Sequence, residues 1–249
     1  MFEFMTLPRP KRTRREKFRR RMSTLAPALL LAGFWGGVIE PDTLTTPHSN
    51  LALGTAPNGG IVGASTLNGS LNAGMTNVAF EKTGALRIAV ISDLHVGSPW
   101  IDLEKVAEVV ATTNAQDPDI ILLAGDYLIT GVVGGKYTDP AVFAPILGGL
   151  QAKHGVYAVL GNHDHWEDGK GVTESFTKAG ITMLENETQT ISHMGQDIIL
   201  AGIGTFGEGK HDMRVVNALG TETSPVIVFT HNPELFEHLP DNVDLAIGG

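Results

Sequence analysis

The sequence predicts an α/β layered fold for residues 85–249, with mixed sheets flanked by helices. Short apolar runs of strand length alternate there with amphipathic stretches, as in proteins whose helices pack on the faces of a sheet. The segment Thr182–Gly202 is predicted to form a hairpin that turns near Met194–Gln196. Its antiparallel strands would make the sheet mixed. The runs expected to form strands are Leu86–Ile91, Ile120–Leu123, Val156–Leu160, Ile198–Ala201, Val226–Phe229 and Leu245–Ile247.

Three segments between these runs carry helix signals. Apolar residues recur at helical spacing from Leu103 to Val110, directly after Asp102, which is suited to cap a helix N-terminus. A second helix is expected to end at Gly180. A short third helix is expected to begin at Asn232, which is followed by Pro233 at the first helical position.

Charge is distributed unevenly along the chain. Nine of the 18 Lys and Arg residues lie between Arg9 and Arg21. Residues 22–249 carry the other nine against 25 acidic residues, a formal charge of −16. The acidic character of residues 22–249 disfavours nucleic-acid binding, which requires basic residues against phosphate. It is compatible with the binding of metal cations. The chain has no cysteine, which excludes disulfides and thiolate metal sites.

The N-terminal part has the order of a signal sequence or signal anchor. Residues 1–22 form a basic cytoplasmic n-region, 23–40 an apolar signal sequence or membrane anchor, and 41–84 a low-complexity linker. This order predicts a membrane-associated or exported protein whose folded domain lies on the extracytoplasmic side. Cleavage and anchoring both stay open. The alternative is a disordered basic tail followed by a core helix.

Polar residues follow four of the expected strands, at the point where each strand ends. In open α/β sheets, ligands gather beyond the carboxyl ends of the strands. We therefore expect these side chains to meet at one rim. In chain order they are Asp93, His95, Asp126, Asn162, His163 and His231.

These residue types suit a pair of divalent metal ions, which require oxygen and imidazole ligands and a bridging carboxylate. Asp93 and His95 could reach one ion if the chain turns after the strand. Asp126 is the candidate bridge between the ions. Asn162 offers a carbonyl oxygen and His231 an imidazole to the second ion.

The candidate catalytic residues stand next to a ligand. His163 is placed to face the substrate, and Asp164 could hold its ring by a hydrogen bond and keep it protonated for a leaving group. Gly125, which precedes the candidate bridge, has no side chain to block the approach of other groups. The remaining histidines of this region, expected to be loop or rim residues, are His165, His193 and His211.

Four motifs occur in a fixed order: Ile91–Gly97 (ISDLHVG), Gly125–Tyr127 (GDY), Gly161–Asp164 (GNHD) and Thr230–Pro233 (THNP). In this order they resemble the calcineurin-like metallophosphoesterases over residues 85–249. The resemblance implies that family's layered sandwich and a phosphoesterase with two divalent ions, namely Mn, Fe or Zn.

The resemblance also implies a role for each matching residue. Asp93, His95 and Asp126 would bind one ion. Asp126, Asn162 and His231 would bind the other, with His163 as the catalytic acid.

Two further segments, Leu160–Trp166 and Leu184–Glu187, resemble the bacterial membrane-associated branch of this family. Some members of that branch cleave the pyrophosphate of UDP-diacylglucosamine. No arginine occurs between Arg87 and Arg214, so the sequence shows no bidentate clamp for a phosphate dianion. This favours a phosphodiester or pyrophosphate substrate, including a lipid-linked one.

The resembled family closes its site with a Gly-His-x-His motif after a strand. Here the corresponding strand is Asp244–Ile247, and Gly248-Gly249 stand where that motif would begin. We therefore expect a domain that is incomplete at its C-terminus, with the last strands and two ligands missing. The alternative function is a truncated, catalytically impaired fragment or a non-enzymatic metal-binding module.

Overall fold

The first sheet consists of parallel strands that lie side by side in chain order. The computed structural model describes residues 44, 46–49, 85–205, 210–219 and 224–249. The strand order is β1-β2-β3-β4, and β2 is buried at all four positions, as a central parallel strand is. The strands are β1 (Ile88–Ile91), β2 (Ile120–Leu123), β3 (Val156–Ala158) and β4 (Thr182–Met183).

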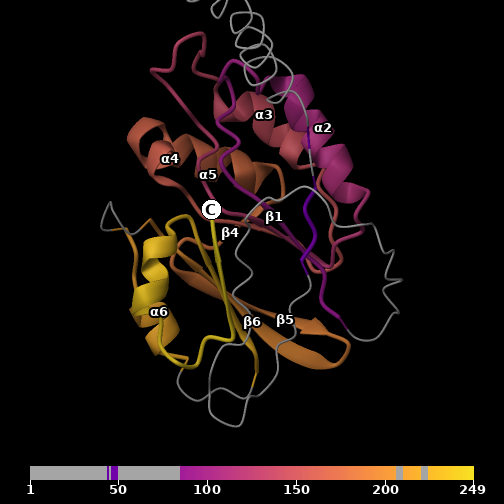
Figure 1. Cartoon of the computed structure of the whole chain (residues 1–249), viewed down its shortest axis with the longest axis vertical. Coiled ribbons are helices and arrows are strands. Elements are labelled where there is room, and N and C mark those ends of the chain that lie inside the picture. The colour runs from indigo at the N-terminus through magenta and orange to yellow at the C-terminus, as the bar shows by residue number, and fades with distance from the viewer. Residues whose placement is uncertain (1–43, 45, 50–84, 206–209, 220–223) are drawn as a thin grey trace, which may run out of the picture. The chain divides into compact units, whose positions relative to one another are not determined.

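The helices that connect these strands cover one face of the sheet (Figure 1). Crossovers between parallel strands are nearly always right-handed, so strands added in chain order place their helices on the same side. The caps are local: the Asp102 carboxylate accepts a hydrogen bond from the Lys105 amide at the start of α2. The helices are α2 (Leu103–Asn114), α3 (Pro140–Leu147), α4 (Asn162–Glu167) and α5 (Gly169–Lys178).

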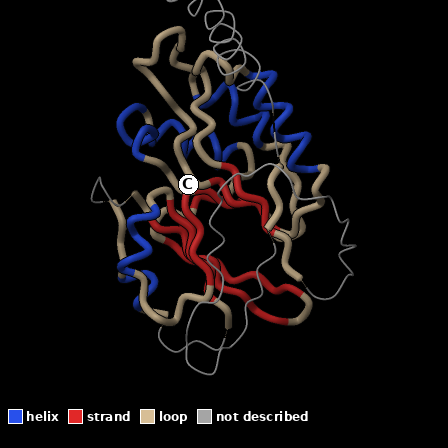
Figure 2. Tube along the Cα trace, viewed as in Figure 1, coloured by secondary structure: helices blue, strands red, loops and turns tan. Residues whose placement is uncertain are grey.

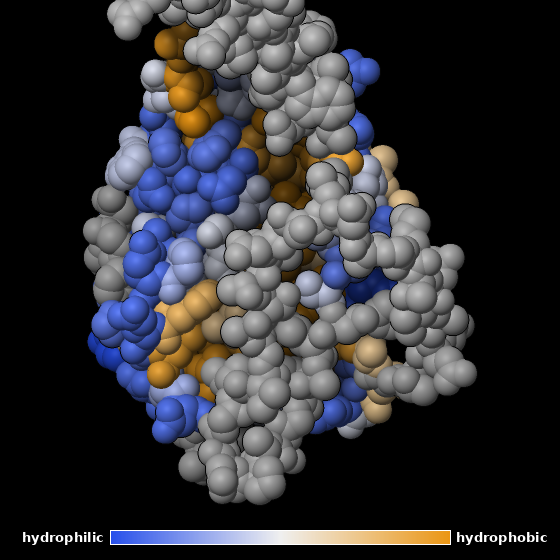
Figure 3. All heavy atoms as spheres, viewed as in Figure 1, coloured by the Kyte–Doolittle hydropathy of each residue, from blue (hydrophilic) through white to orange (hydrophobic). Residues whose placement is uncertain are grey.

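Helix α5 shows why this face is covered. Val172 and Phe176, one turn apart, are fully buried, while its other side chains are largely polar. Figure 3 shows hydrophilic residues gathered over α4 and α5 on the face in view. The helix ends at Lys178, and Gly180 beyond it has a φ of +84°, which glycine adopts without strain.

The second sheet is mixed. A hairpin joins its first two strands, and its turn residues Met194 and Gly195 both have positive φ (52° and 84°), as a type I′ turn requires. The other pairings are parallel. The sheet runs in the order β5 (Glu187–His193), β6 (Gln196–Ile203), β7 (Val226–Thr230), β8 (Leu245–Gly248), with α6 (Arg214–Asn217) and the 3₁₀ helix η3 (Pro233–His238) beside it.

Figure 2 shows the helices lying outside the strands. Three hydrophobic clusters hold these layers together. One packs the helices α2, α3 and α5 against the first sheet, and includes Phe143 and Phe176. A second lies between the two sheets, and includes Leu122 and Phe229. A third packs the outer face of the second sheet against α6 and η3 through Val216 and Leu235. The layers are therefore helix, sheet, sheet and helix.

The expected α/β sandwich is confirmed, and so are the bounds of β2, the Asp102 cap and the turn of the hairpin. Two expectations are wrong in detail. Thr182–Met183 pairs with β3 in the first sheet, so the hairpin begins only at Glu187. The short helix starts after Asn232 as expected, but it is a 3₁₀ helix and the Asn232 side chain makes no capping hydrogen bond.

The proposed n-region and apolar segment, residues 1–40, lie outside the described residues, as does most of the proposed linker. Among the described residues, none of the helices has the length and apolar character needed to span a bilayer.

Truncating Phe176 tests the helix-to-sheet layer. Its ring is fully buried and lies 4.6 Å from the ring of Tyr127 and 6.2 Å from that of Phe143, measured between centroids. Phe176→Ala should lower the free energy of unfolding by about 3–5 kcal/mol, measured by urea denaturation. Val142→Ala, at a half-exposed position on α3, is the control and should stay within about 1 kcal/mol.

Candidate metal centre

The polar residues predicted to meet at one rim do so. They follow β1, β2 and β3 of the first sheet and β7 of the second. Ligand atoms of Asp93, Asp126 and His231 lie within 4.8 Å of one another, as do those of His95, Asp126 and His163. Asn162 joins them through its Oδ1 atom, 3.1 Å from Nε2 of His231.

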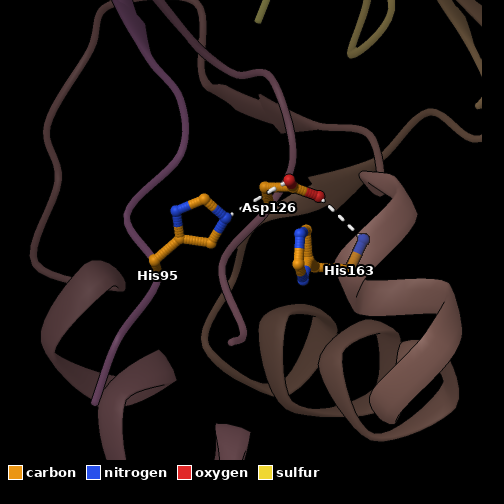
Figure 4. Close-up of side chains that lie close together, drawn as sticks. All are labelled: His95, Asp126 and His163. Carbon is orange, nitrogen blue, oxygen red and sulfur yellow. Dashed lines mark hydrogen bonds and ion pairs between the residues drawn. The ribbon is translucent and has the colours of Figure 1, made fainter. Parts of the chain in front are cut away.

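Asp126 stands between two histidines, one from each sheet. Its Oδ2 atom lies 3.3 Å from Nε2 of His95 and 3.3 Å from Nε2 of His231. Burial opposes ionisation, but the hydrogen bonds from the two rings outweigh it and lower the pKa of Asp126 well below its usual range. Figure 4 shows the Asp126 carboxylate reaching the His95 ring on one side and the amide of His163 on the other.

The histidines respond to this carboxylate in turn. The hydrogen bond to Asp126 raises the pKa of His95 against the effect of burial. Burial lowers the pKa of His231, but the same carboxylate more than compensates, and the net shift is upward. The group therefore favours a positive charge next to Asp126, which a proton or a metal cation can supply.

The loops that carry these residues have an unusual backbone. Asp93, His95 and Asp126 all have positive φ, at 55°, 46° and 56°. Residues other than glycine seldom adopt this region, and such strain gathers at functional sites. The two loops run alongside each other, because the amides of Asp93 and His95 donate to the carbonyls of Gly125 and Asp126 at 3.0 Å each.

Two glycines allow the loops to approach. A Cβ atom on Gly125 would lie 2.6 Å from the amide nitrogen of Gly161, and φ is +96° there. A Cβ atom on Gly161 would lie 2.1 Å from Oδ1 of Asp126. The absence of a side chain at Gly125, singled out from the sequence, therefore matters for the contact between the loops that follow β2 and β3.

His231 is held in the tautomer that a metal ligand needs. Its Nδ1 atom lies 2.9 Å from the carbonyl oxygen of Ala124 and so donates its proton there. Nε2 faces oxygen atoms of Asp126 and Asn162: it donates to them when the ring is protonated and offers its lone pair to a metal ion when the ring is neutral. This is the usual arrangement for a histidine that binds a metal through one nitrogen and is oriented through the other.

The buried carboxylate of Asp164 organises the loops. Oδ2 accepts hydrogen bonds from the amides of Asp126 and Gly161, and Oδ1 from those of Tyr127 and Leu128, all at 2.9–3.0 Å. Burial raises the pKa of Asp164 to about 6, although these amides favour the charged form. The hydrogen bond expected from Asp164 to the ring of His163 is not formed, because the carboxylate is engaged with the backbone.

His163 is instead positioned through its backbone and by ring contacts. Its amide donates to Oδ1 of Asp126 at 2.9 Å. Its ring meets that of His95 edge-on at 5.1 Å and that of Trp166 at 4.8 Å between centroids. Trp166 is 58% exposed, so this side of the ring faces the surface.

Which of the predicted ligands bind the same ion stays a prediction. Asp93 lies with Asp126 and His231, whereas His95 lies with Asp126 and His163. Sequence reasoning also gave no role to Glu185, whose Oε2 accepts from the amide of Leu160 at the end of β3. The one sequence signal for Glu185 was its position in Leu184–Glu187, a segment that resembles the bacterial membrane-associated branch.

The end of β8 reaches the same rim. Gly249 donates its amide to the carbonyls of Thr230 and His231. A Cβ atom built on it would lie 2.9 Å from Nδ1 of His231. Five strands of the described chain, three from the first sheet and two from the second, therefore end at this centre.

Residues 86–249 match the family model described as calcineurin-like phosphoesterase, which is more than half of the chain. The chain belongs to this family. The placement of Asp93, His95, Asp126, Asn162 and His231 around one rim gives this membership a structural counterpart.

Curated relatives of the chain are consistent with this family. The chain is 34% identical over 163 residues to a putative metallophosphoesterase of Caenorhabditis elegans, F40B5.2, covering 61% of this chain and 32% of that protein. It is 29% identical over 178 residues to the phosphodiesterase YaeI of Escherichia coli, covering 69% and 63%. It is 22% identical over 270 residues to the UDP-2,3-diacylglucosamine pyrophosphatase LpxG of Chlamydia trachomatis, covering 88% and 72%.

Among solved structures, the NAD nucleotidase NadN of Haemophilus influenzae is similar, with a TM-score of 0.50 and 16% identity over 66% of this chain and 38% of that one. This is a likeness of fold alone. The chain spans 32% and 63% of the first two curated relatives, less than two thirds of either.

Replacing Asp164 tests its role in organising the loops. Asp164→Asn keeps one acceptor oxygen but turns an NH₂ group toward two of the four amides. It should lower the free energy of unfolding by roughly 3 kcal/mol, measured by urea denaturation. Asp168→Asn is the matched control, because asparagine caps α5 as well as aspartate does. Equal losses in the two variants would contradict the assignment.

Proposed function

We propose that the rim is a binuclear metal centre that hydrolyses a phosphodiester or pyrophosphate bond. The observation that carries this proposal is the Asp126 carboxylate, held between His95 and His231 with His163 beside it. Family membership supports a phosphoesterase, and relatives described as a phosphodiesterase and a pyrophosphatase support the bond type.

The residues present fit divalent ions. Asp93, His95, Asp126, Asn162 and His231 offer the oxygen and imidazole donors that Mn, Fe and Zn accept. When bound, the ions would polarise the phosphoryl oxygens and lower the pKa of an attacking water. Asp126 lies between His95 and His231 and would serve both ions, and His231 would bind through Nε2, because its Nδ1 donates to Ala124.

His163 is the residue that we assign to proton transfer. It carries an imidazole at the rim, its amide is fixed to Asp126, and its ring lies between His95 and the exposed Trp166. It would donate a proton to the departing oxygen of the substrate. Asp164 acts as a positioning residue, since it holds the loop that carries Asp126 and the turn at Gly161.

The charges around the rim favour a diester or pyrophosphate over a monoester dianion. Among the described residues the arginines are Arg87 and Arg214. The first donates to the carbonyls of Gln116 and Asp117, and the second is paired with Asp212 at 2.6 Å. Neither reaches the rim, so the described part of the chain offers no guanidinium there to clamp a dianion.

We further propose that the substrate is linked to a lipid and that the domain acts outside the cytoplasm. The relative described as a UDP-2,3-diacylglucosamine pyrophosphatase supports the first part. The basic residues up to Arg21, followed by the apolar Leu25–Ile39, support the second.

Comparing two variants separates catalysis from metal binding. In the full chain loaded with Mn²⁺, His163→Gln should lower turnover of a nitrophenyl phosphodiester by roughly 10²–10⁴-fold without loss of bound metal. Asp126→Asn should lose both. His165→Gln, two residues along α4, is the control and should retain metal and most of the turnover. Loss of metal in His163→Gln equal to that in Asp126→Asn would contradict the assigned acid.

Substrate class is tested with the same loaded chain. Turnover of a nucleoside-diphosphate lipid and of a nitrophenyl diester should exceed that of a phosphate monoester by at least about tenfold. The products measured are the nucleoside monophosphate, the nitrophenol and inorganic phosphate, respectively. Preference for the monoester would overturn the proposed class. Bound metal with no turnover of any substrate would favour the non-enzymatic metal-binding alternative.

A further inference from the structure

A second group of metal-binding residue types lies at the other end of the strands. Asp119 directly precedes β2, His154 stands just before β3, and His193 is the last residue of β5. Ligand atoms of the three side chains lie within 4.8 Å of one another. The rim begins after β2, so the length of this strand, about 13 Å, separates the group from the centre around Asp126.

The two imidazoles of this group already face each other. Nε2 of His154 lies 3.1 Å from Nδ1 of His193, and the rings meet edge-on. Two ligands on a tetrahedral ion with bonds of about 2.1 Å stand roughly 3.4 Å apart. A small separation of the rings would therefore place both lone pairs on one ion.

The His193 ring is not fully satisfied by the protein. Its Nε2 atom is buried and has no hydrogen-bond partner. This nitrogen lies on the other side of the ring from Nδ1, so it would carry the proton while Nδ1 offers its lone pair toward His154. His193, expected from the sequence to be a loop or rim residue, is a half-buried residue at the end of a strand.

Asp119 supplies the oxygen donor and is preorganised. Its side chain is buried, with Oδ2 accepting from the amide of Arg87 at 2.7 Å and Oδ1 from the ammonium of Lys153 at 2.8 Å. Burial opposes ionisation, but these donors outweigh it and lower the pKa of Asp119. Each oxygen keeps a further lone pair, so the carboxylate can still bind an ion.

We propose that Asp119, His154 and His193 form a zinc site that ties the first sheet to the β5–β6 hairpin at the end remote from the rim. Two imidazoles and one carboxylate select Zn²⁺ and related transition metals over Mg²⁺ and Ca²⁺, which prefer oxygen alone. A water molecule would complete four ligands. The Lys153 ammonium is the charge that opposes binding, since it competes for the same carboxylate.

The number of bound ions tests the site directly. The full chain is dialysed against Zn²⁺ and its metal content is measured by mass spectrometry. Because the proposed centre at the rim would also bind Zn²⁺, the readout is the difference between variants. His193→Gln should lose one equivalent per chain relative to the unaltered protein and keep its Mn²⁺-dependent turnover. The exposed His238, outside both groups, serves as the control: His238→Gln should lose none.

Lys153→Gln tests the site by a gain of zinc affinity. It leaves all three proposed ligands unchanged. Titrated with Zn²⁺ in an Asp126→Asn background against a chromophoric chelator, it should bind Zn²⁺ roughly tenfold more tightly, because it removes a cation 2.8 Å from the carboxylate. Unchanged affinity in Lys153→Gln would overturn the proposal, and so would unchanged zinc content in a folded His193→Gln. Circular dichroism establishes folding in each case.

Discussion

Four backbone amides converge on the buried carboxylate of Asp164, two on each oxygen. Three come from the loop after β2 and one from the turn after β3, so a single side chain fixes two loops that are far apart in the sequence. The position of Asp126 follows from this, because its own amide is one of the four. The carboxylate that faces His95 and His231 is thus aimed by a second carboxylate beneath it.

Electrostatics at the rim depends on the same arrangement. Burial acts to raise the pKa of both Asp126 and Asp164. The histidines beside Asp126 outweigh burial and lower its pKa, whereas the amides around Asp164 do not, and its pKa is raised. Asp126 is accordingly suited to bind cations, and Asp164 accepts hydrogen bonds from backbone amides. This division follows from where each side chain points, and the sequence contains no equivalent information.

Much of the fold was accessible from the sequence because its signals are local. The apolar run at Ile120–Leu123 and the cap at Asp102 depend on neighbouring residues, and both are confirmed. The helix α3 was missed, since its run of apolar residues lacks a polar face and contains Pro145. The pairing of Thr182–Met183 with β3 is a long-range contact, and a strand of two residues has no sequence pattern that predicts it.

The candidate site shows the same limit. That Asp93, His95, Asp126, Asn162 and His231 would meet was predictable, since the carboxyl ends of parallel strands share one edge. How the ligands group around Asp126, and what Asp164 binds, depends on loops with positive φ whose course the sequence does not reveal. The proximity of His154 to His193 arises only when the hairpin packs on the first sheet.

Each sheet is encoded by a continuous stretch, the first by residues 88–183 and the second by residues 187–248. The rim takes Asp126 from one stretch and His231 from the other, so neither half contains it alone. Metal affinity at the rim therefore depends on how the two sheets pack against each other. A substitution in the apolar layer between the sheets, such as at Leu122 or Phe229, could alter the spacing of the ligands without touching one of them.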